Sequence, residues 1–351
     1  MLSLRCWFTA VVPLILFISL PQATMFPVGD LRPDNAHDIA PHAQTGKNYN
    51  EIWTYQLWLN NGVQAQINLS RAFFGSFKDP VCGTDFALMG FRNQNYFVAR
   101  EYPSKNFVFD SARTRLSVHE KIFFEGLPPQ KHRLFFSTVK KDVSYFVDLT
   151  FSDMIPGAVW GDGIFHLNDN QSVGLFFHIP KSRVHGRIAL NGDTLNVDGF
   201  GWMDHTWQTG FATKLINTGY RYDIIPKTAG ANGRIEDGYF FDDGSSVFGY
   251  GLREDGGHWT LLRPKGIKTL DQGSLMNLDL PKRLEIVFDK TASTRLQRRE
   301  DRQQTSALQE LSKMERFAAR MFLGGQIYGL RGTAWVDDSL PAIYSITRIS
   351  R

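Results

Sequence analysis

The sequence predicts a mostly β protein built from two domains. Aromatic residues make up 13% of the 351 residues, and Gly (31) and Pro (15) are frequent, which is typical of short strands joined by turns. Hydrophobic residues make up 42%, enough for two modest cores, and the length favours two domains. Segments that alternate bulky and polar residues recur along the chain between turn residues. We therefore expect antiparallel sheets rather than alternating strands and helices.

The first residues have the layout of a secretory signal peptide. Arg5 precedes an apolar run from Cys6 to Leu20, and small or polar residues follow. Such a run is too short for a full membrane span. We place cleavage near Ala23, so residues 1–23 form the signal peptide, and an uncleaved signal anchor is the alternative. Both versions export the protein, to the periplasm or the extracellular space.

The mature chain is predicted to begin with a surface segment and to continue in hairpins. Residues 24–48 are rich in Pro, Asp, His and Asn and have no periodicity, which is typical of a lead-in segment. Residues 53–74 then alternate bulky and polar residues around Asn-Asn-Gly, the pattern of a strand, a turn and a strand. Similar patterns occur at residues 190–199, 239–262 and 282–288. These segments are predicted to form meandering antiparallel strands.

One stretch near the C-terminus has helical periodicity. From about Thr305 to Met321 apolar residues recur every three or four positions, and Gly324-Gly325 ends the pattern. We expect this helix to pack against a sheet, with peripheral membrane contact as the alternative. The segment before it, from Arg295 to Arg302, reads RLQRREDR. We interpret it as a solvated helix face rather than a surface for anionic lipid or nucleic acid, and we expect no nucleic-acid partner.

A short internal echo supports two similar domains. The segment Gly199-Phe-Gly-Trp-Met-Asp-His205 resembles Gly332-Thr-Ala-Trp-Val-Asp-Asp338. Each copy follows strand-like sequence and can close one β-domain. Trp202 and Trp335 occupy matching places and are expected in the two cores. The predicted domains are residues 49–210 and 211–351.

The segment GFGWMDHTWQTGF, residues 199–211, carries the candidate chemistry. Side chains alternate on a strand, so one face carries Met203, His205 and Trp207, and the other carries Trp202, Asp204 and Thr206. Asp204 and His205 therefore cannot point into one cavity. His205 is a titratable ring between apolar neighbours suited to a hydrocarbon-like ligand, and Trp207 can stabilise a positive charge. A hydrogen-bonded structural histidine is the alternative interpretation.

Several other kinds of chemistry lack their sequence motifs. There is no G-x-S-x-G motif, no phosphate-binding glycine loop and no dinucleotide-binding fingerprint, which argues against hydrolases and nucleotide enzymes. The nine histidines form neither H-x-H nor H-E-x-x-H, and removal of Cys6 leaves only Cys82, so neither a metal nor a disulfide is expected. Asp242-Asp243-Gly244 is interpreted as a hairpin turn rather than a calcium site.

Four segments together resemble a known family. They are GFGWMDHTWQT, the hairpins EIWTYQLWLNNG and YFFDDGSSVFGYGLREDGG, and the terminal GTAWVDD, and they extend from about residue 51 to residue 338. They resemble the carotenoid 1,2-hydratase (hydroxyneurosporene synthase) group and its tandem lipocalin-like (AttH-like) relatives, with Asp-His-x-Trp as the specific element. The resemblance implies two lipocalin-like antiparallel β-domains in tandem, with one inserted helix near the C-terminus. It also implies an apolar ligand in a cavity and no metal or organic cofactor.

The resemblance also implies roles for individual residues. His205 and Trp207 match the catalytic histidine and tryptophan of the family, and Asp242 matches its aspartate by hairpin position. The residues expected to contact the ligand are Met203, Trp207, Phe240 and Tyr222. Hydration of an unactivated alkene requires a proton donor, which a carboxylic acid with a raised pKa can supply. Two positions depart from the family, because Phe240 replaces its tyrosine and Gln208 replaces its glycine.

Two classes of function follow from these observations. The first is an exported binding protein, or a cofactor-independent hydratase, lyase, isomerase or cyclase, for a hydrophobic isoprenoid-like or lipid ligand. An enzyme requires His205 and Asp242 to face one cavity, whereas a carrier requires only apolar walls. The second class is a non-catalytic structural or interaction module of the cell envelope, which would use the helix at residues 305–321 and have a filled interior.

Overall fold

The protein is mostly β, as predicted. The computed structural model describes residues 25–42, 48–75, 79–168, 170–226, 234–275, 278–289, 292–306 and 324–351. Within these ranges all strands pair antiparallel in two sheets, and the only helices are two α-helices and two 3-10 turns of a single turn each. None of these helices is long and apolar enough to cross a membrane. The predicted signal peptide, residues 1–23, lies outside the described residues.

The first sheet contains 14 strands in the order β5-β4-β3-β2-β14-β13-β10-β9-β8-β7-β6, with β1 on β11 and both β11 and β12 on β13. Its elements are β1 (Leu31–Pro33), α1 (Ala36–Ile39), β2 (Asn48–Leu59), η1 (Asn60–Gly62), β3 (Gln64–Phe74), β4 (Val81–Phe91), β5 (Gln94–Pro103), η2 (Ser104–Asn106), β6 (Val108–Asp110), β7 (Arg115–His119), β8 (Ile122–Glu125), β9 (His132–Lys140), β10 (Val143–Ser152), β11 (Ala158–Trp160), β12 (Ile164–Asn168), β13 (Gln171–Leu190) and β14 (Asp193–Thr209). The sheet curls until β7 contacts β3 and β4, and an apolar core fills its interior.

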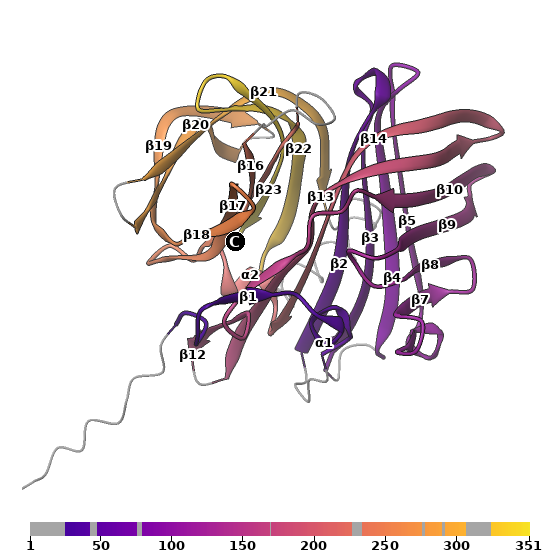
Figure 1. Ribbon diagram of the computed structural model, residues 1–351, viewed down its shortest axis with the longest axis horizontal. Helices are drawn as coiled ribbons and strands as arrows, with labels where there is room; N and C mark the ends of the chain where they lie inside the picture. Colours follow the sequence, from indigo (N-terminus) through magenta and orange to yellow (C-terminus); the bar gives the residue numbers. More distant parts are fainter. Residues whose placement is uncertain are drawn as a thin grey trace, which may run out of the picture.

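The second sheet contains nine strands in the order β18-β17-β16-β15-β23-β22-β21-β20-β19. Its elements, after α2 (Ala212–Leu215), are β15 (Thr218–Ile224), β16 (Ile235–Asp242), β17 (Val247–Asp255), β18 (His258–Leu262), β19 (Pro264–Leu275), β20 (Leu278–Phe288), β21 (Ser293–Ser306), β22 (Gln326–Val336) and β23 (Leu340–Ser350). This sheet curls until β17 contacts β19, and it encloses a separate apolar core (Figure 1).

The predicted hairpins are present, and their turns explain the sequence. Asn61 has a φ of 60° and Gly62 a φ of 71° where β2 meets β3, and Asn191 with Gly192 repeats this left-handed geometry between β13 and β14. Asn and Gly tolerate positive φ better than other residues, so these pairs fix the turns. The turn at Asp242-Asp243-Gly244 joins β16 to β17, and Asp243 accepts backbone N–H groups from Ser245 and Ser246, as the turn interpretation predicted.

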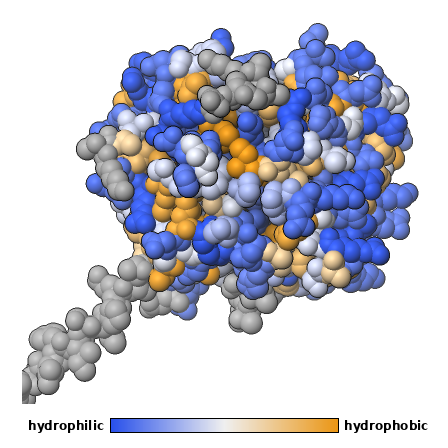
Figure 2. All heavy atoms as spheres, viewed as in Figure 1, coloured by the Kyte–Doolittle hydropathy of each residue, from blue (hydrophilic) through white to orange (hydrophobic). Residues whose placement is uncertain are grey.

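The two sheets pack side by side through shared apolar clusters (Figure 1). One cluster joins Trp160 and Phe177 of the first sheet to Phe248 and Tyr250 of the second. Another joins Trp202 to residues that lie in a strand of the second sheet or directly after one. In the view of Figure 2, apolar residues gather mainly over the second sheet, on the left, whereas the outer part of the first sheet is mostly hydrophilic. The molecule therefore has three places for a site: inside each sheet and between them.

The predicted lead-in segment differs from expectation. Within residues 24–48, β1 pairs with β11, and α1 begins at a capping box in which Asn35 and Asp38 satisfy each other's backbone N–H groups. Ile39 is fully buried, and its carbonyl accepts the indole N–H of Trp53. The segment has no periodicity in its own sequence, because contacts with strands that are distant in the sequence determine its position.

The basic segment before the predicted C-terminal helix also differs. Residues from Arg295 to Arg302 belong to β21, which pairs with β20 and β22, so the interpretation as a helix face is wrong. Thr305 and Ser306 end the same strand, and residues 307–321 of the predicted helix lie outside the described residues. Trp335 is half-buried beneath the Arg299 guanidinium rather than in the core, whereas Trp202 is buried as expected.

Candidate functional site

The strand β14 lies between β2 and β13, and its two faces lead to two different buried polar clusters. The predicted alternation is confirmed by the contacts of each side chain. His205 and Trp207 pack among aromatic residues on the first-sheet side, and Met203 joins the first core. Trp202 and Asp204 face residues of the second sheet. The two faces of β14 therefore belong to two separate clusters.

On the first face, three groups hold the His205 ring. Its plane stacks on Trp53, with ring centroids 4.3 Å apart and an interplanar angle of 17°. Its Nε2 lies 3.0 Å from Glu51 Oε1, and its Nδ1 lies 3.1 Å from the Asp38 carbonyl oxygen. The ring is fully buried, and burial lowers the pKa of His205 to about 4 despite the opposing influence of Glu51. His205 is therefore a neutral, fixed ring at neutral pH.

Glu51 is the centre of this cluster. Its Oε2 accepts a 2.5 Å hydrogen bond from Arg71 Nε, and its Oε1 accepts the His42 backbone N–H at 2.8 Å. The His42 ring also approaches Oε1, with Nδ1 at 3.3 Å. Burial alone would raise the pKa of Glu51, but its contacts with His205 and His42 and the charge of Arg71 outweigh burial and lower the pKa. Glu51 is therefore a buried carboxylate that accepts hydrogen bonds from Arg71 and from the His42 backbone.

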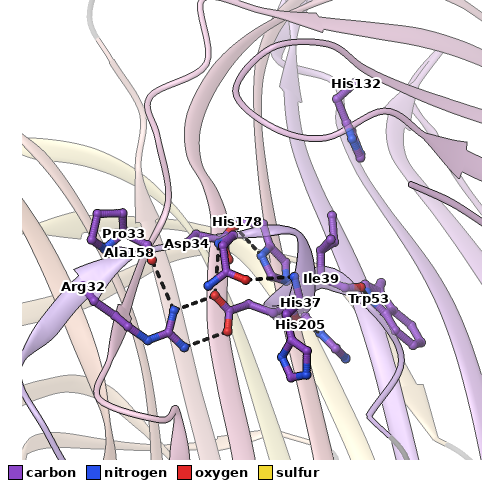
Figure 3. A network of polar contacts seen from close by, with 12 residues as sticks. Arg32, Pro33, Asp34, His37, Ile39, Trp53, His132, Ala158, His178 and His205 are labelled. Atoms are coloured by element: carbon purple, nitrogen blue, oxygen red, sulfur yellow. Dashed lines mark hydrogen bonds and ion pairs between the residues drawn. The ribbon is translucent and has the colours of Figure 1, made fainter. Parts of the chain in front are cut away.

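The short N-terminal elements place further charged side chains around this cluster (Figure 3). Arg32 forms a bidentate ion pair with Asp38, at 2.6 and 2.7 Å. Asp34 lies 2.7 Å from Nδ1 of His178, whose ring centroid is 5.6 Å from that of His205. The other nitrogen of His178, Nε2, is buried without a hydrogen-bond partner among the described residues.

On the second face of β14, Arg221 joins the two sheets. It forms an ion pair with Asp204 of β14 and hydrogen bonds of 3.1 and 3.2 Å with Asp223 of its own strand. Burial and the nearby Asp223 raise the pKa of Asp237 well above its usual range. The nearby indole of Trp202 lowers that pKa slightly in comparison. Within the described residues, neither the Trp202 indole nitrogen nor the Asp237 oxygens make a hydrogen bond of normal geometry. Asp237 is therefore a buried carboxyl group whose surroundings favour its protonated form.

A small cavity of about 150 Å³ adjoins this face, between β2, β3, β14 and the second sheet. Its walls include Thr206, Arg221, Tyr239 and Arg331. Arg331 donates to the neutral amide oxygens of Gln66 and Gln303. The cavity is therefore polar and lies where the two sheets meet.

A larger cavity of about 630 Å³ lies at one end of the second sheet. Its apolar walls are Met25, Phe26, Pro27, Trp160, Val247 and Pro264. Charged side chains stand at its edge, and the Arg263 guanidinium lies 4.7 Å from the centre of the Trp160 ring. Two further cavities, of about 360 and 280 Å³, lie along the first sheet.

The structure does not bring all the predicted site residues together. Met203, His205 and Trp207 lie on one face of β14, but Tyr222 and Phe240 pack in the core of the second sheet. Asp242 lies at a hairpin end, where its Oδ1 accepts the Gly244 N–H at 2.7 Å. None of these six residues lines the four cavities described above. The enzyme hypothesis requires His205 and Asp242 to face one cavity, and neither residue lines any of these four.

Sequence reasoning missed several residues of these clusters. Glu51 carried a usable signal, because it shares a strand face with Trp53 and Tyr55, where an acidic residue must be buried and paired. Asp237 follows Glu236 in a strand with buried neighbours, which is a weaker signal of the same kind. His42 carried none, because it follows α1 in a segment without periodicity.

Solved structures share this architecture over nearly the whole chain. A candidate AttH protein from Nitrosomonas europaea matches with a TM-score of 0.64 and 14% identity, over 93% of this chain and 99% of its own. CghA, solved with Sch210972, matches with a TM-score of 0.56 and 11% identity, over 94% and 97%. Kievitone hydratase from Nectria haematococca matches with a TM-score of 0.48 and 12% identity, over 93% and 98%. No protein-family model and no curated protein matches the sequence.

The first two similarities bear on the fold alone. They show that the two curled sheets are lipocalin-like β-domains in tandem, as the motifs around β2 and β14 implied. At 14% and 11% identity they do not carry an activity from one protein to another. The function has to be argued from the cavities and the buried clusters.

Proposed function

We propose that this chain binds a hydrophobic small molecule of the isoprenoid-like or lipid class. The single observation that carries the proposal is the cavity of about 630 Å³ with apolar and aromatic walls. Ligand pockets have volumes of about 300–1,000 Å³, and their walls are mostly apolar with a few polar groups that fix orientation. Phe26, Trp160 and Val247 would contact the hydrocarbon part of the ligand. Arg263 would contact a polar end group.

The tandem lipocalin-like fold supports the same proposal. CghA, which shares the fold, has been solved with the small molecule Sch210972. We also propose that the chain is exported, on the basis of the apolar run from Cys6 to Leu20. An exported carrier would hold a poorly soluble molecule away from water.

A cofactor-independent enzyme is the second candidate, and Asp237 favours it. A protonated carboxylic acid in a buried site can donate a proton to an alkene, which begins a hydration, an isomerisation or a cyclisation. Asp237 would take the acid role that the sequence suggested for Asp242. The cavity of about 150 Å³ beside Arg221 does not have Asp237 among its lining residues and is smaller than the usual ligand pocket, so we rank binding first.

The test of binding uses a fluorescent fatty-acid probe, 11-(dansylamino)undecanoic acid, with energy transfer from tryptophan. Wild type should bind it, and Val247→Arg should weaken binding at least about tenfold because the new charge lies in the apolar wall. Val139→Arg is the matched control, because Val139 is an exposed valine of β9 on the first sheet. Equal binding by wild type and Val247→Arg, with both folded, would show that the probe does not use this cavity.

The enzyme candidate is tested with the natural ligand. Native mass spectrometry of protein purified from its own host, with organic extraction, identifies what co-purifies. Incubation of the extracted compound in isotopically labelled water would reveal hydration by the gain of one labelled water. The enzyme candidate predicts that Asp237→Asn retains binding and loses turnover. A ligand that stays unchanged with wild type supports the carrier alone.

A further inference from the structure

Three side chains from three separate segments of the chain converge beside β14. His42 follows α1, Glu51 lies in β2 and His205 lies in β14. One donor atom from each lies within 4.8 Å of the other two. Glu51 and His205 are fully buried, and the side chain of His42 is 14% exposed. Two imidazoles and one carboxylate are a frequent ligand set for divalent transition metals.

The spacing of these atoms agrees with metal coordination. Glu51 Oε1 lies 3.0 Å from His205 Nε2 and 3.3 Å from His42 Nδ1. Metal–ligand bonds of about 2.0–2.1 Å place neighbouring ligand atoms about 2.9 Å apart in octahedral geometry and about 3.3 Å apart in tetrahedral geometry. One ion can therefore contact Oε1 and either nitrogen without a change of backbone.

Hydrogen bonds already orient two of the three groups. A neutral imidazole has one N–H, and the Asp38 carbonyl oxygen, 3.1 Å from Nδ1 of His205, can only accept it. The lone pair of Nε2 then points at Glu51 Oε1, which also has only lone pairs to offer. Arg71 holds the other oxygen of Glu51, Oε2. Metal sites commonly have such outer hydrogen bonds, which fix the ring and the carboxylate.

The charges of the surrounding groups also leave room for a cation. Three carboxylates, of Asp34, Asp38 and Glu51, stand beside two guanidinium groups, of Arg32 and Arg71. The carboxylates and guanidinium groups alone sum to one negative charge (3 − 2 = 1). A positive charge beside them, carried by a bound cation or by a proton, would balance this sum.

A third imidazole gives an independent indication. His178 packs beside His205, and its Nε2 is fully buried without a hydrogen-bond partner among the described residues. Buried polar atoms in folded proteins nearly always have a partner, so this nitrogen indicates a group or water that completes the cluster. Asp34 fixes the ring through its other nitrogen.

We propose that His42, Glu51 and His205 bind one divalent transition-metal ion, for which zinc is the natural probe. The sequence motifs indicated no metal, because the three ligands come from three separate segments and match no short spacing pattern. Three protein ligands leave at least one coordination position for a water molecule or a ligand atom. The site is independent of the apolar cavity and does not rest on the proposed binding function.

The experiment measures metal content and zinc affinity of the untagged full chain. Protein purified without chelator is analysed by mass spectrometry of the elements, then stripped with dipicolinate and titrated with Zn²⁺ by calorimetry. His42→Ala removes the most exposed ligand and is the variant least able to disturb folding. His185→Ala is the matched control, because His185 is an exposed histidine of β13. Cobalt absorption spectra of each protein report the coordination geometry.

We expect about one metal per wild-type chain, retained by His185→Ala, and zinc affinity at least about 100-fold weaker in His42→Ala. Glu51→Gln, checked for folding by circular dichroism, should also lose the intense visible bands of tetrahedral cobalt. Wild type that neither contains a metal nor takes up zinc or cobalt would overturn the proposal, and a proton shared by His205 and Glu51 would replace the ion. Equal zinc binding by wild type and His42→Ala would overturn it as well.

Discussion

At the scale of single residues, the protein contains buried histidines whose pKa is lowered by burial. His132 is fully buried, with its Nε2 2.7 Å from the Tyr55 hydroxyl and its Nδ1 2.7 Å from the Gly126 carbonyl oxygen. A neutral ring satisfies both neighbours, because Nδ1–H donates to the carbonyl and Nε2 accepts from the hydroxyl. Burial lowers the pKa of His132 to about 4. His132 differs from His205, whose two nitrogens both face acceptors.

We predict that His132 makes the protein less stable in mild acid. The unfolded chain takes up this proton below about pH 6.5, whereas the folded protein does so only near pH 4, so stability falls as pH falls between these values. The full effect is about 3 kcal/mol. Urea unfolding of wild type and His132→Gln at about pH 7 and about pH 4.5 measures it.

His132→Gln should show a smaller loss of unfolding free energy between the two pH values than wild type. His185→Gln, on an exposed histidine, should behave as wild type does. An identical pH dependence in wild type and His132→Gln would show that the buried ring is not the source.

At the scale of single elements, the sequence predicted strands well where local contacts define them. The β2–β3 and β13–β14 hairpins were visible because alternation and Asn-Gly turns lie next to each other in the chain. The strand β21 was misread because its charged residues at 295–302 carry no apolar periodicity, and its strand pairing depends on β20 and β22. The elements β1 and α1 were missed for the same reason, since β11 and β2 hold them in place.

The capping box of α1 should be necessary for the position of His42. Asn35 accepts the His37 backbone N–H at 2.8 Å, and Asp38 accepts the Asn35 N–H at 3.0 Å. Loss of such a cap costs about 1 kcal/mol, so Asn35→Ala should increase opening of this segment about fivefold. Hydrogen exchange of the His42 amide, which donates to Glu51, is the measurement.

His37→Ala is the control on the same helix, because His37 is exposed and only its backbone takes part in the cap. Its His42 amide should exchange as slowly as in wild type. An unchanged exchange rate in Asn35→Ala would show that β1 and the Arg32–Asp38 ion pair hold the segment without the cap.

At the scale of the whole molecule, the buried charges of Arg221 join the two sheets. The Arg221 ion pair with Asp204 connects β15 to β14, and Asp223 completes it. We predict that Arg221→Gln lowers the free energy of unfolding by about 3–5 kcal/mol, because Asp204 and Asp223 would remain buried without their cation. Denaturant unfolding followed by tryptophan fluorescence measures the loss.

The exposed pair of Arg92 and Asp193 provides the control. Arg92→Gln should cost less than about 1 kcal/mol, because solvent screens surface ion pairs. Adding Asp204→Asn to Arg221→Gln should restore part of the stability. A cost for Arg221→Gln no larger than that for Arg92→Gln would contradict a joining role for the buried pair.

Contacts between distant segments also explain which parts of the site could be predicted from the sequence. The prediction that His205 and Asp204 point to opposite faces of β14 is correct, because successive side chains of a strand alternate between its faces. The partners of these two residues could not be predicted from the sequence, because they are distant in the chain. Asp38 is 167 positions from His205, and Asp204 pairs with an arginine of the other sheet. The role suggested for Asp242 rested on its hairpin position, which does not determine which cavity a side chain faces.

The place of β14 between β2 and β13 has a consequence for biosynthesis. A ribosome that adds about 5–20 residues per second needs about 8–30 s to pass from Leu59, the end of β2, to Thr209, the end of β14. During that interval one long edge of β2 has no partner, and its residues Trp53, Tyr55 and Leu57 belong to the future core. Bare apolar edges invite pairing with other chains. The nascent polypeptide is therefore exposed to pairing with other chains along β2 until translation reaches the Asp-His-x-Trp segment.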